Sequence, residues 1–191
     1  MKILNLKELP STNEKAKALS RKKIAPWTVI SAEKQTAGYG KEKVFWFSPQ
    51  GGLYFSIVLP KSKIEDLQTL TILAAFIVAK TIKENFNLEP FIKLPNDVWI
   101  NGKKVCGILT ESVIGASTGS APTLSRVERV GKEVKSSVIG IGLNTNIDKF
   151  PKELEKTATS LKIELGKEVD NEKILKEIIQ GLKEQLATIS D

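Results

Sequence analysis

An Asn-Gly pair at Asn101-Gly102 lies between two short apolar segments, and it constrains the fold of this chain more than any other feature. Tight two-residue hairpin turns need positive φ at both central positions, which Asn and Gly tolerate, so the stretch from Phe91 to Leu109 predicts a β-hairpin of two strands. Asn96 and Asp97 precede the turn and Lys104 follows it. Pairing the strands would bring an amide, a carboxylate and an ammonium together at one end of a sheet, which predicts a site for a reaction on an anion.

The residue composition excludes several classes of enzyme. The 191 residues contain no histidine, so neither a Ser-His-Asp nor a Cys-His catalytic site can form, and a histidine-ligated zinc site is excluded too. The single cysteine, Cys106, excludes an internal disulfide and predicts a small buried strand residue. We therefore predict no metal ion held by the protein itself.

Length and charge set the remaining limits. One domain spanning residues 1–191 is expected at this size, and the formal charge of +7 favours an anionic partner such as a nucleotide, an acidic protein or a nucleic acid. No signal-peptide pattern opens the chain, and no apolar run is long enough to span a bilayer. We expect a soluble cytoplasmic protein without a membrane partner.

The periodicity along the chain predicts an α+β fold with a mixed, largely antiparallel sheet flanked by helices. Ser11, Thr12 and Asn13 favour a helix N-cap, which could also present hydroxyls to a ligand. Strands are expected at 3–9, 27–33, 52–59 and 137–146, a long buried helix at 64–86 and an amphipathic helix at 171–189. The stretch from 112 to 137 is expected to be a long, partly mobile excursion.

A glycine-rich and lysine-rich loop follows the second predicted strand. Gly38 and Gly40 allow the backbone to turn tightly, and Lys41 adds positive charge, so the loop is typical of anion binding, although a mobile surface loop is the alternative. It matches neither a Walker A loop nor a dinucleotide fingerprint. The aromatic residues 45–47 could close over a flat heterocycle or anchor the loop to the core.

Six segments together resemble the biotin-protein ligase family, in order and approximate spacing, over nearly the whole chain. The most specific is the block from Lys93 to Leu109. The segments are Ser11-Thr12-Asn13, Gln35-Thr36-Ala37-Gly38-x-Gly40, Lys93-x-Pro95-Asn96-Asp97, Lys104-Val105-x-Gly107-Ile108-Leu109, Gly140-Ile141-Gly142-Leu143-Asn144 and Ala158-Thr159-Ser160-Leu161.

The resemblance implies a fold like that of class II aminoacyl-tRNA synthetase cores and an enzyme that works in two steps. ATP, with Mg²⁺, would activate biotin as biotinyl-5′-AMP, and a lysine of a biotin carboxyl carrier protein would then take the biotinyl group. Lysines and Mg²⁺ can offset the charge of such a reaction without histidine. The resemblance also allows a homodimer.

Roles for individual residues follow from the same resemblance. Lys104 would hold the reacting carboxylate and α-phosphate, and Asp97 would orient or deprotonate the acceptor lysine, with Asn96 on the metal-phosphate side. Trp46 would stack on adenine and Asn144 would read its edge. The remaining assignments are contacts to the ureido ring by Ser11, Thr12 and Gln35 with the backbone at Gly38 and Tyr39, a place beside them for Asn13 and Gly40, and room for the ligand at Gly107, Gly140 and Gly142.

The chain departs from the family pattern at three places. Lys41 replaces an arginine that helps to retain the adenylate. The lysine ammonium is a point charge, whereas the arginine guanidinium is a planar fork of N–H donors. Leu94 replaces the usual tryptophan, and the excursion after residue 114 is longer than usual. The start and end of the chain predict neither an N-terminal DNA-binding domain nor a C-terminal small β-barrel domain, so no DNA partner is expected.

Two other functions stay open at this point. A lipoate-protein ligase or octanoyl transferase shares the fold and would be marked by an open apolar tunnel in place of a closed ureido pocket. A non-catalytic biotin or nucleotide sensor would bind its ligand without turnover, as a consequence of the altered loop.

Overall fold

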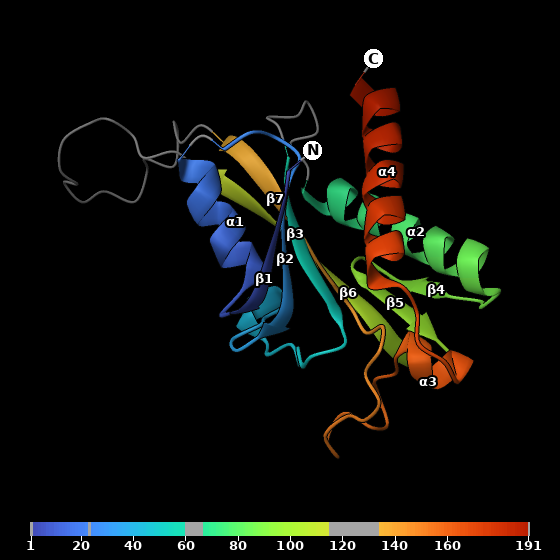
Figure 1. Ribbon diagram of the computed structural model, residues 1–191. Helices are drawn as coiled ribbons and strands as arrows, with labels where there is room; N and C mark the ends of the chain where they lie inside the picture. The colour runs from blue at the N-terminus through green and yellow to red at the C-terminus, as the bar shows by residue number, and fades with distance from the viewer. Residues whose placement is uncertain (1, 23, 60–66, 115–133, 191) are drawn as a thin grey trace.

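A seven-stranded sheet forms the centre of the protein, shown as a computed structural model in Figure 1, which describes residues 2–22, 24–59, 67–114 and 134–190. The strand order is β1-β2-β3-β7-β6-β5-β4, and only the β1–β2 pair is parallel. The strands are β1 (Ile3–Leu9), β2 (Thr28–Gln35), β3 (Leu53–Leu59), β4 (Phe91–Lys93), β5 (Asp97–Ile100), β6 (Lys103–Ile114) and β7 (Val134–Leu143). The helices are α1 (Thr12–Arg21), α2 (Leu67–Phe86), α3 (Leu161–Leu165) and α4 (Asn171–Ser190).

The helices lie on both faces of the sheet, α1 on one and the packed pair α2 and α4 on the other (Figure 1). The alternation of strand side chains explains the division, because successive residues point to opposite faces. On β7, Ile139, Ile141 and Leu143 are buried in the core with α2 and α4, whereas Val138 joins the smaller core beneath α1. Gly140 and Gly142 therefore open on the α1 face.

The central hairpin forms as predicted, with one correction. Asn101 and Gly102 have φ of 49° and 76°, and Ile100 pairs with Lys103 across the turn. The predicted first strand is in fact two, β4 and β5, joined through the Pro95-Asn96 corner and paired antiparallel. The hairpin is thus the end of a three-stranded unit, with β4 as an edge of the sheet.

Strands β1, β2 and β3 and helices α1 and α4 lie close to their predicted ranges. The strand predicted at 137–146 ends at Leu143, helix α3 was not predicted, and the stretch 112–137 differs as well. Helix α2 is described from Leu67, and the predicted start at 64–66 lies outside the described residues, as does the stretch 115–133. The prediction of an excursion over 112–114 and 134–137 is wrong, because these residues extend β6 and β7. Val113 and Val138 are buried beneath α1, so this end of the β6–β7 pair packs on the smaller core. Within the described ranges, no helix combines the length and apolarity needed to span a membrane.

Candidate active site

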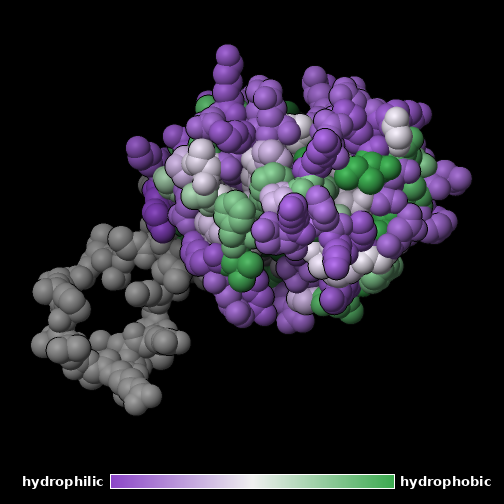
Figure 2. Space-filling model, turned by 90° about the horizontal axis from the view of Figure 1, so that it is seen from below, coloured by the Kyte–Doolittle hydropathy of each residue, from purple (hydrophilic) through white to green (hydrophobic). Residues whose placement is uncertain are grey.

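A cavity of about 420 Å³ opens on the α1 face of the sheet, a size typical of small-molecule sites. Its walls come from the start of α1, the 38–47 loop, the β5–β6 hairpin, the glycines of β7 and the 144–158 segment. Seen from below, the surface is largely hydrophilic with separate hydrophobic areas (Figure 2). Val44 and Phe45 line the cavity yet are each 66% exposed, so an apolar part of the loop reaches the surface at its rim.

The residues assigned to the site from the sequence lie together here. Gly38 is the exception, because it does not line the cavity. The lining residues among them are Ser11, Thr12, Asn13, Gln35, Tyr39, Gly40, Lys41, Trp46, Asn96, Asp97, Lys104, Gly107, Gly140, Gly142 and Asn144. A Cβ on Gly38 would come within 2.6 Å of Ser48 Oγ and 2.9 Å of the Trp46 carbonyl oxygen, so this glycine is needed for the packing of the loop.

An ion pair occupies the hairpin end of the cavity. Lys104 Nζ lies 2.7 Å from Asp97 Oδ1, and both side chains are largely but not fully covered. The contact is one of charge and not of an aligned hydrogen bond, because Asp97 Oδ1 is buried without a hydrogen-bond partner. Asn96 is tied to the same strand, since its carbonyl accepts from Ile108 N at 2.8 Å.

The backbone of Lys104 is held on two sides. Its N–H donates to the Thr157 carbonyl at 2.8 Å, and its carbonyl accepts from Thr159 N at 2.9 Å, so the 157–159 segment runs beside β6 as a short parallel bridge at Ala158. On the other side, Lys104 stands opposite Trp99 on β5. This double support fixes where the ammonium can reach.

Trp46 lies flat against the glycines of the sheet, next to the ion pair. A Cβ on Gly142 would be 2.5 Å from Trp46 Nε1, and one on Gly107 would be 3.1 Å from Trp46 Cζ3. Lys104 Nζ lies 5.1 Å from the ring centroid, within cation–π range. These two glycines make room for the indole, and the cavity lies beside it.

A network of polar side chains forms the other end of the cavity. Ser11 is the N-cap of α1, as predicted, with its hydroxyl 3.5 Å from Glu14 N. Thr12 donates to Gln35 Oε1 from its backbone N at 2.8 Å and from its hydroxyl at 3.1 Å. Ser56 Oγ lies 2.8 Å from Thr12 Oγ1 and donates to Asn13 Oδ1 at 2.5 Å. The space above Gly140 is taken by Asn13, because a Cβ there would be 2.0 Å from Asn13 Oδ1.

Asn144 presents a buried acceptor to the cavity. It is 3% exposed, and its Nδ2 donates to the Thr159 carbonyl at 3.0 Å. Its Oδ1 is buried and has no hydrogen-bond partner among the described residues. A buried oxygen of this kind is costly unless a donor reaches it, so a ligand with an N–H group fits this position.

The glycine loop folds back on itself over the cavity. Gly40 N donates to the Val44 carbonyl at 2.8 Å, and Trp46 N donates to the Gly38 carbonyl at 2.9 Å, with Tyr39 and Phe45 bridged between them. Lys41 lines the cavity. The loop is therefore held by its own backbone hydrogen bonds beside the cavity.

Sequence reasoning missed several parts of the site. Trp99 lines the cavity, and its two-residue spacing from Asp97 on one strand could have placed both on the same face. Phe150, Leu154 and Thr157 also line it, but they come from an irregular segment that carries no periodic signal. Among the described residues, no three His, Cys, Asp or Glu side chains gather as a metal-ion site.

One face of the sheet packs against α2 and α4, and the other face carries a cavity that holds the Lys104–Asp97 ion pair. A known protein family matches the sequence of this chain. The sequence profile of the biotin/lipoate A/B protein ligase family matches residues 6–121. The chain belongs to this family.

Within the family, the greater likeness is to biotin protein ligases. The biotin protein ligase of Aquifex aeolicus, solved in complex with biotin and ATP, is 30% identical, with a TM-score of 0.82 over 99% of this chain and 72% of that one. A bipartite lipoate protein ligase of Thermoplasma acidophilum shares the fold at 13% identity, with a TM-score of 0.58. The fold predicted from the sequence is confirmed.

A curated relative is the bifunctional ligase/repressor BirA of Bacillus subtilis. It is 35% identical over 175 residues, which are 90% of this chain and 49% of the relative. The chain therefore spans about half the length of the curated relatives that it matches most extensively.

Proposed function

We propose that this chain is an ATP-dependent biotin-protein ligase, which activates biotin as biotinyl-5′-AMP and transfers the biotinyl group to a lysine of a biotin carboxyl carrier protein. The observation that carries the proposal is that one cavity holds both a hydrogen-bonding end, at Thr12 and Gln35, and a charged end, at Lys104 and Asp97. The first suits a ureido ring and the second suits the carboxylate and phosphate that must react.

In the first step, a carboxylate oxygen of biotin attacks the α-phosphorus of ATP. A new P–O bond forms, the bond to the bridging oxygen breaks, and pyrophosphate leaves. Both reactants are anions, so cations must offset their repulsion. The ammonium of Lys104 lies 2.7 Å from Asp97 Oδ1 and carries three N–H donors, which can be offered to the carboxylate and the α-phosphate. Mg²⁺ would enter with the ATP phosphates as part of the substrate.

The nucleotide would lie along Trp46 towards Asn144. The indole offers a flat face next to the lysine that holds the phosphate, which suits a stacked adenine. Because Asn144 Nδ2 is already engaged with Thr159, its Oδ1 is the atom left for the ligand, and it can only accept. The exocyclic amino group of adenine is a hydrogen-bond donor on the edge of the base that would face Asn144 Oδ1, whereas guanine carries an acceptor at that position. This predicts a preference for ATP over GTP.

In the second step, the acceptor lysine attacks the acyl carbon of the adenylate. An amide bond forms, the bond to the phosphate oxygen breaks, AMP leaves, and the attacking nitrogen gives up a proton. Asp97 is the carboxylate that the ion pair holds at the reacting end, so it is the group placed to orient the incoming amine. Lys41, on the loop that covers the cavity, would help to keep the adenylate bound until the carrier arrives. We place the reaction in the cytoplasm, where ATP is available.

The test is a transfer assay with biotin, ATP, Mg²⁺ and a biotin carboxyl carrier domain, read by the intact mass of the carrier. We expect one added biotinyl group, on one lysine, and none when ATP is omitted or the carrier lysine is changed to arginine. Transfer of lipoate in place of biotin would identify a lipoate ligase. Biotin binding without any transfer would identify a sensor.

A further inference from the structure

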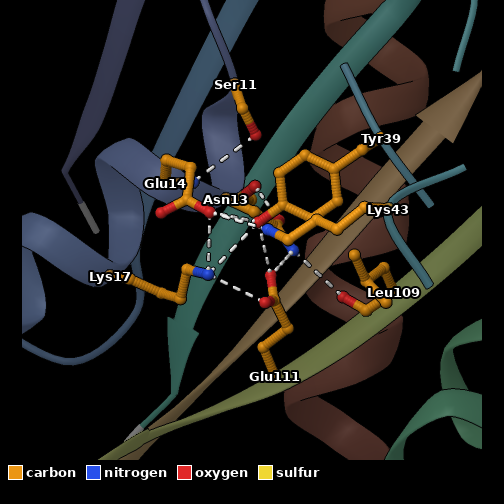
Figure 3. Close-up of polar contacts among 9 residues, drawn as sticks. Ser11, Asn13, Glu14, Lys17, Tyr39, Lys43, Leu109 and Glu111 are labelled. Carbon is orange, nitrogen blue, oxygen red and sulfur yellow. Dashed lines mark hydrogen bonds and ion pairs between the residues drawn. The ribbon is translucent and has the colours of Figure 1, made fainter. Parts of the chain in front are cut away.

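Behind the hydrogen-bonding end of the cavity lies a charged cluster that joins α1, the glycine loop and β6 (Figure 3). Its members are Glu14, Lys17, Tyr39, Lys43 and Glu111. Tyr39 and Lys43 come from the loop, and Glu111 follows Gly107 and Leu109 along the same face of β6. The two carboxylates and two ammonium groups balance in charge.

The loop is bound to this cluster through Tyr39. The tyrosine hydroxyl lies 2.6 Å from Glu14 Oε1 and 3.0 Å from Glu111 Oε2, and it accepts from Lys17 Nζ at 3.2 Å. Lys43 Nζ lies 3.5 Å from the centroid of the Tyr39 ring and 3.1 Å from Glu14 Oε1. The start of the loop is therefore bonded to helix α1 and strand β6 through protein side chains.

The same cluster fixes a residue of the cavity. Asn13 Nδ2 donates to Glu111 Oε2 at 2.9 Å, which leaves Asn13 Oδ1 facing Ser56 at 2.5 Å. Glu111 Oε1 accepts from Lys17 at 2.8 Å. Glu111 thus accepts from Lys17 and Asn13, and its Oε2 also lies 3.0 Å from the Tyr39 hydroxyl, whose single proton can be donated to only one of Glu111 and Glu14 at a time. Glu111 Oε2 is the atom on which the loop contact and the cavity contact meet.

The far end of the loop is tied to the cavity by a second route. Gln35, which accepts from Thr12, donates through its Nε2 to Ser48 Oγ at 3.0 Å, and Ser48 donates to the Trp46 carbonyl at 3.0 Å. Because Thr12 and Asn13 are adjacent and share Ser56, both ends of the loop connect to one hydrogen-bonded set in the cavity floor.

We propose that Glu111 is a positioning residue for the reaction, which holds Asn13 in the orientation that the biotin end requires and, through Tyr39, holds the glycine loop over the cavity before any ligand binds. The proposal rests on the proposed function for its catalytic meaning. Burial raises the pKa of Glu111, but the hydrogen bonds from Lys17 and Asn13 outweigh it, so the net shift is downward and the carboxylate stays ionised at neutral pH.

The substitution Glu111→Gln tests this junction with almost no change in volume. One carboxylate oxygen becomes an NH₂ donor, and it must then face either Lys17 or the donors Asn13 and Tyr39. Two readouts follow without catalysis: tryptic cleavage after Lys41 and Lys43 in the ligand-free protein, mapped by mass, and the Kd for biotin without nucleotide. Because hydrogen bonds to a charged group are involved, we expect cleavage to become about 10-fold faster and biotin binding about 10-fold weaker.

Tyr39→Phe tests the loop contact. It keeps the ring under Lys43 but removes the hydroxyl that lies beside Glu14 and Glu111, so cleavage in the ligand-free protein should accelerate. Glu8→Gln is the matched control, because it breaks an exposed ion pair of the same 2.8 Å length with Lys34, away from the cavity. It should change neither readout.

Three results would overturn the proposal. Unchanged cleavage and unchanged Kd in Glu111→Gln would show that the carboxylate positions nothing. Unchanged cleavage in Tyr39→Phe would remove the loop arm, and a change in both readouts in Glu8→Gln would make the effect one of general stability. Failure of the wild-type protein to bind biotin would refute the proposed function instead, while loop cleavage would still report on the cluster.

Discussion

The substitution Gly140→Ala is the most direct test of how the cavity floor is built. A Cβ at this position would lie 2.0 Å from Asn13 Oδ1, 2.7 Å from Asn13 Cγ and 2.8 Å from Asn13 Nδ2. Ordinary contact begins near 3.4 Å, so the amide must move by about 3.4 − 2.0 = 1.4 Å. Asn13 is 5% exposed and bonded at both ends of its amide, so moving the amide breaks these hydrogen bonds.

The size of the effect follows from the bonds that Asn13 would lose. The contact from Ser56 is one neutral hydrogen bond, worth about 1 kcal/mol, and the contact to the Glu111 carboxylate is worth about 1.5–3 kcal/mol. We expect the free energy of unfolding to fall by about 2–4 kcal/mol, within the range of overpacked sites. Affinity for biotin should fall with it, by at least about tenfold, because the displaced amide enters the hydrogen-bonding end of the cavity.

Urea denaturation followed by circular dichroism gives the stability, and calorimetric titration with biotin gives the affinity. Gly40→Ala is the matched control, since a Cβ there meets only the Val44 carbonyl oxygen at 3.9 Å and φ is −105°. It should leave the unfolding free energy within about 0.5 kcal/mol of the wild type. An equally small change in Gly140→Ala, with biotin affinity intact, would refute the account of Asn13 as a fixed part of the floor.

Three further outcomes follow from the site. Lys104→Ala should slow adenylate formation, measured by pyrophosphate release, by about 10²–10³-fold, whereas its neighbour Lys103→Ala, whose ammonium donates to the Glu155 carbonyl, should leave it unchanged. Lys41→Ala should release adenylate early and label an unrelated acceptor protein, and specific labelling alone would count against its role. The hydrogen bond from Tyr39, followed by those from Lys17 and Lys43, lowers the pKa of Glu14 from 4.5 to about 2, so its stabilising contribution is full above pH 4.5 and is lost towards pH 2. Thermal midpoints of Glu14→Gln should therefore fall less steeply than those of the wild type across this window.

The parts of the fold that could be predicted are those with local causes. Asn101-Gly102 fixed its turn because its positive φ values depend only on the two residues, and Ser11 capped α1 because an N-cap is satisfied within one turn. The end of β6 was missed because Val113 is a strand residue through burial beneath α1, which is a tertiary effect. The start of β7 was missed with it, because Val134 and Ser136 are in the strand through their pairing with Ile114 and Val113.

The same distinction holds for the site. The approach of Lys104 to Asp97 follows from strand pairing across the turn, so the hairpin pattern could indicate it. The alternating Gly140 and Gly142 indicated open space on one face, but the sequence could not say that Asn13 and Trp46 take up part of it. Those side chains arrive from α1 and from the loop, and only the assembled sheet brings them there.

Two lysines of the glycine loop looked alike in the sequence, and the structure separates them. Lys43 Nζ is 3.1 Å from Glu14 and stacks on Tyr39, so its charge is engaged in holding the loop. Lys41 lines the cavity, where an anion would lie. A loop that is anchored by Lys43 can present Lys41 at a fixed place. Less conformational freedom of the loop is then lost when the adenylate binds, which compensates for the absence of the planar guanidinium of an arginine. Lys43→Ala should consequently loosen the loop and raise adenylate loss in the same direction as Lys41→Ala. It should also speed cleavage after Lys41 in the ligand-free protein relative to the wild type.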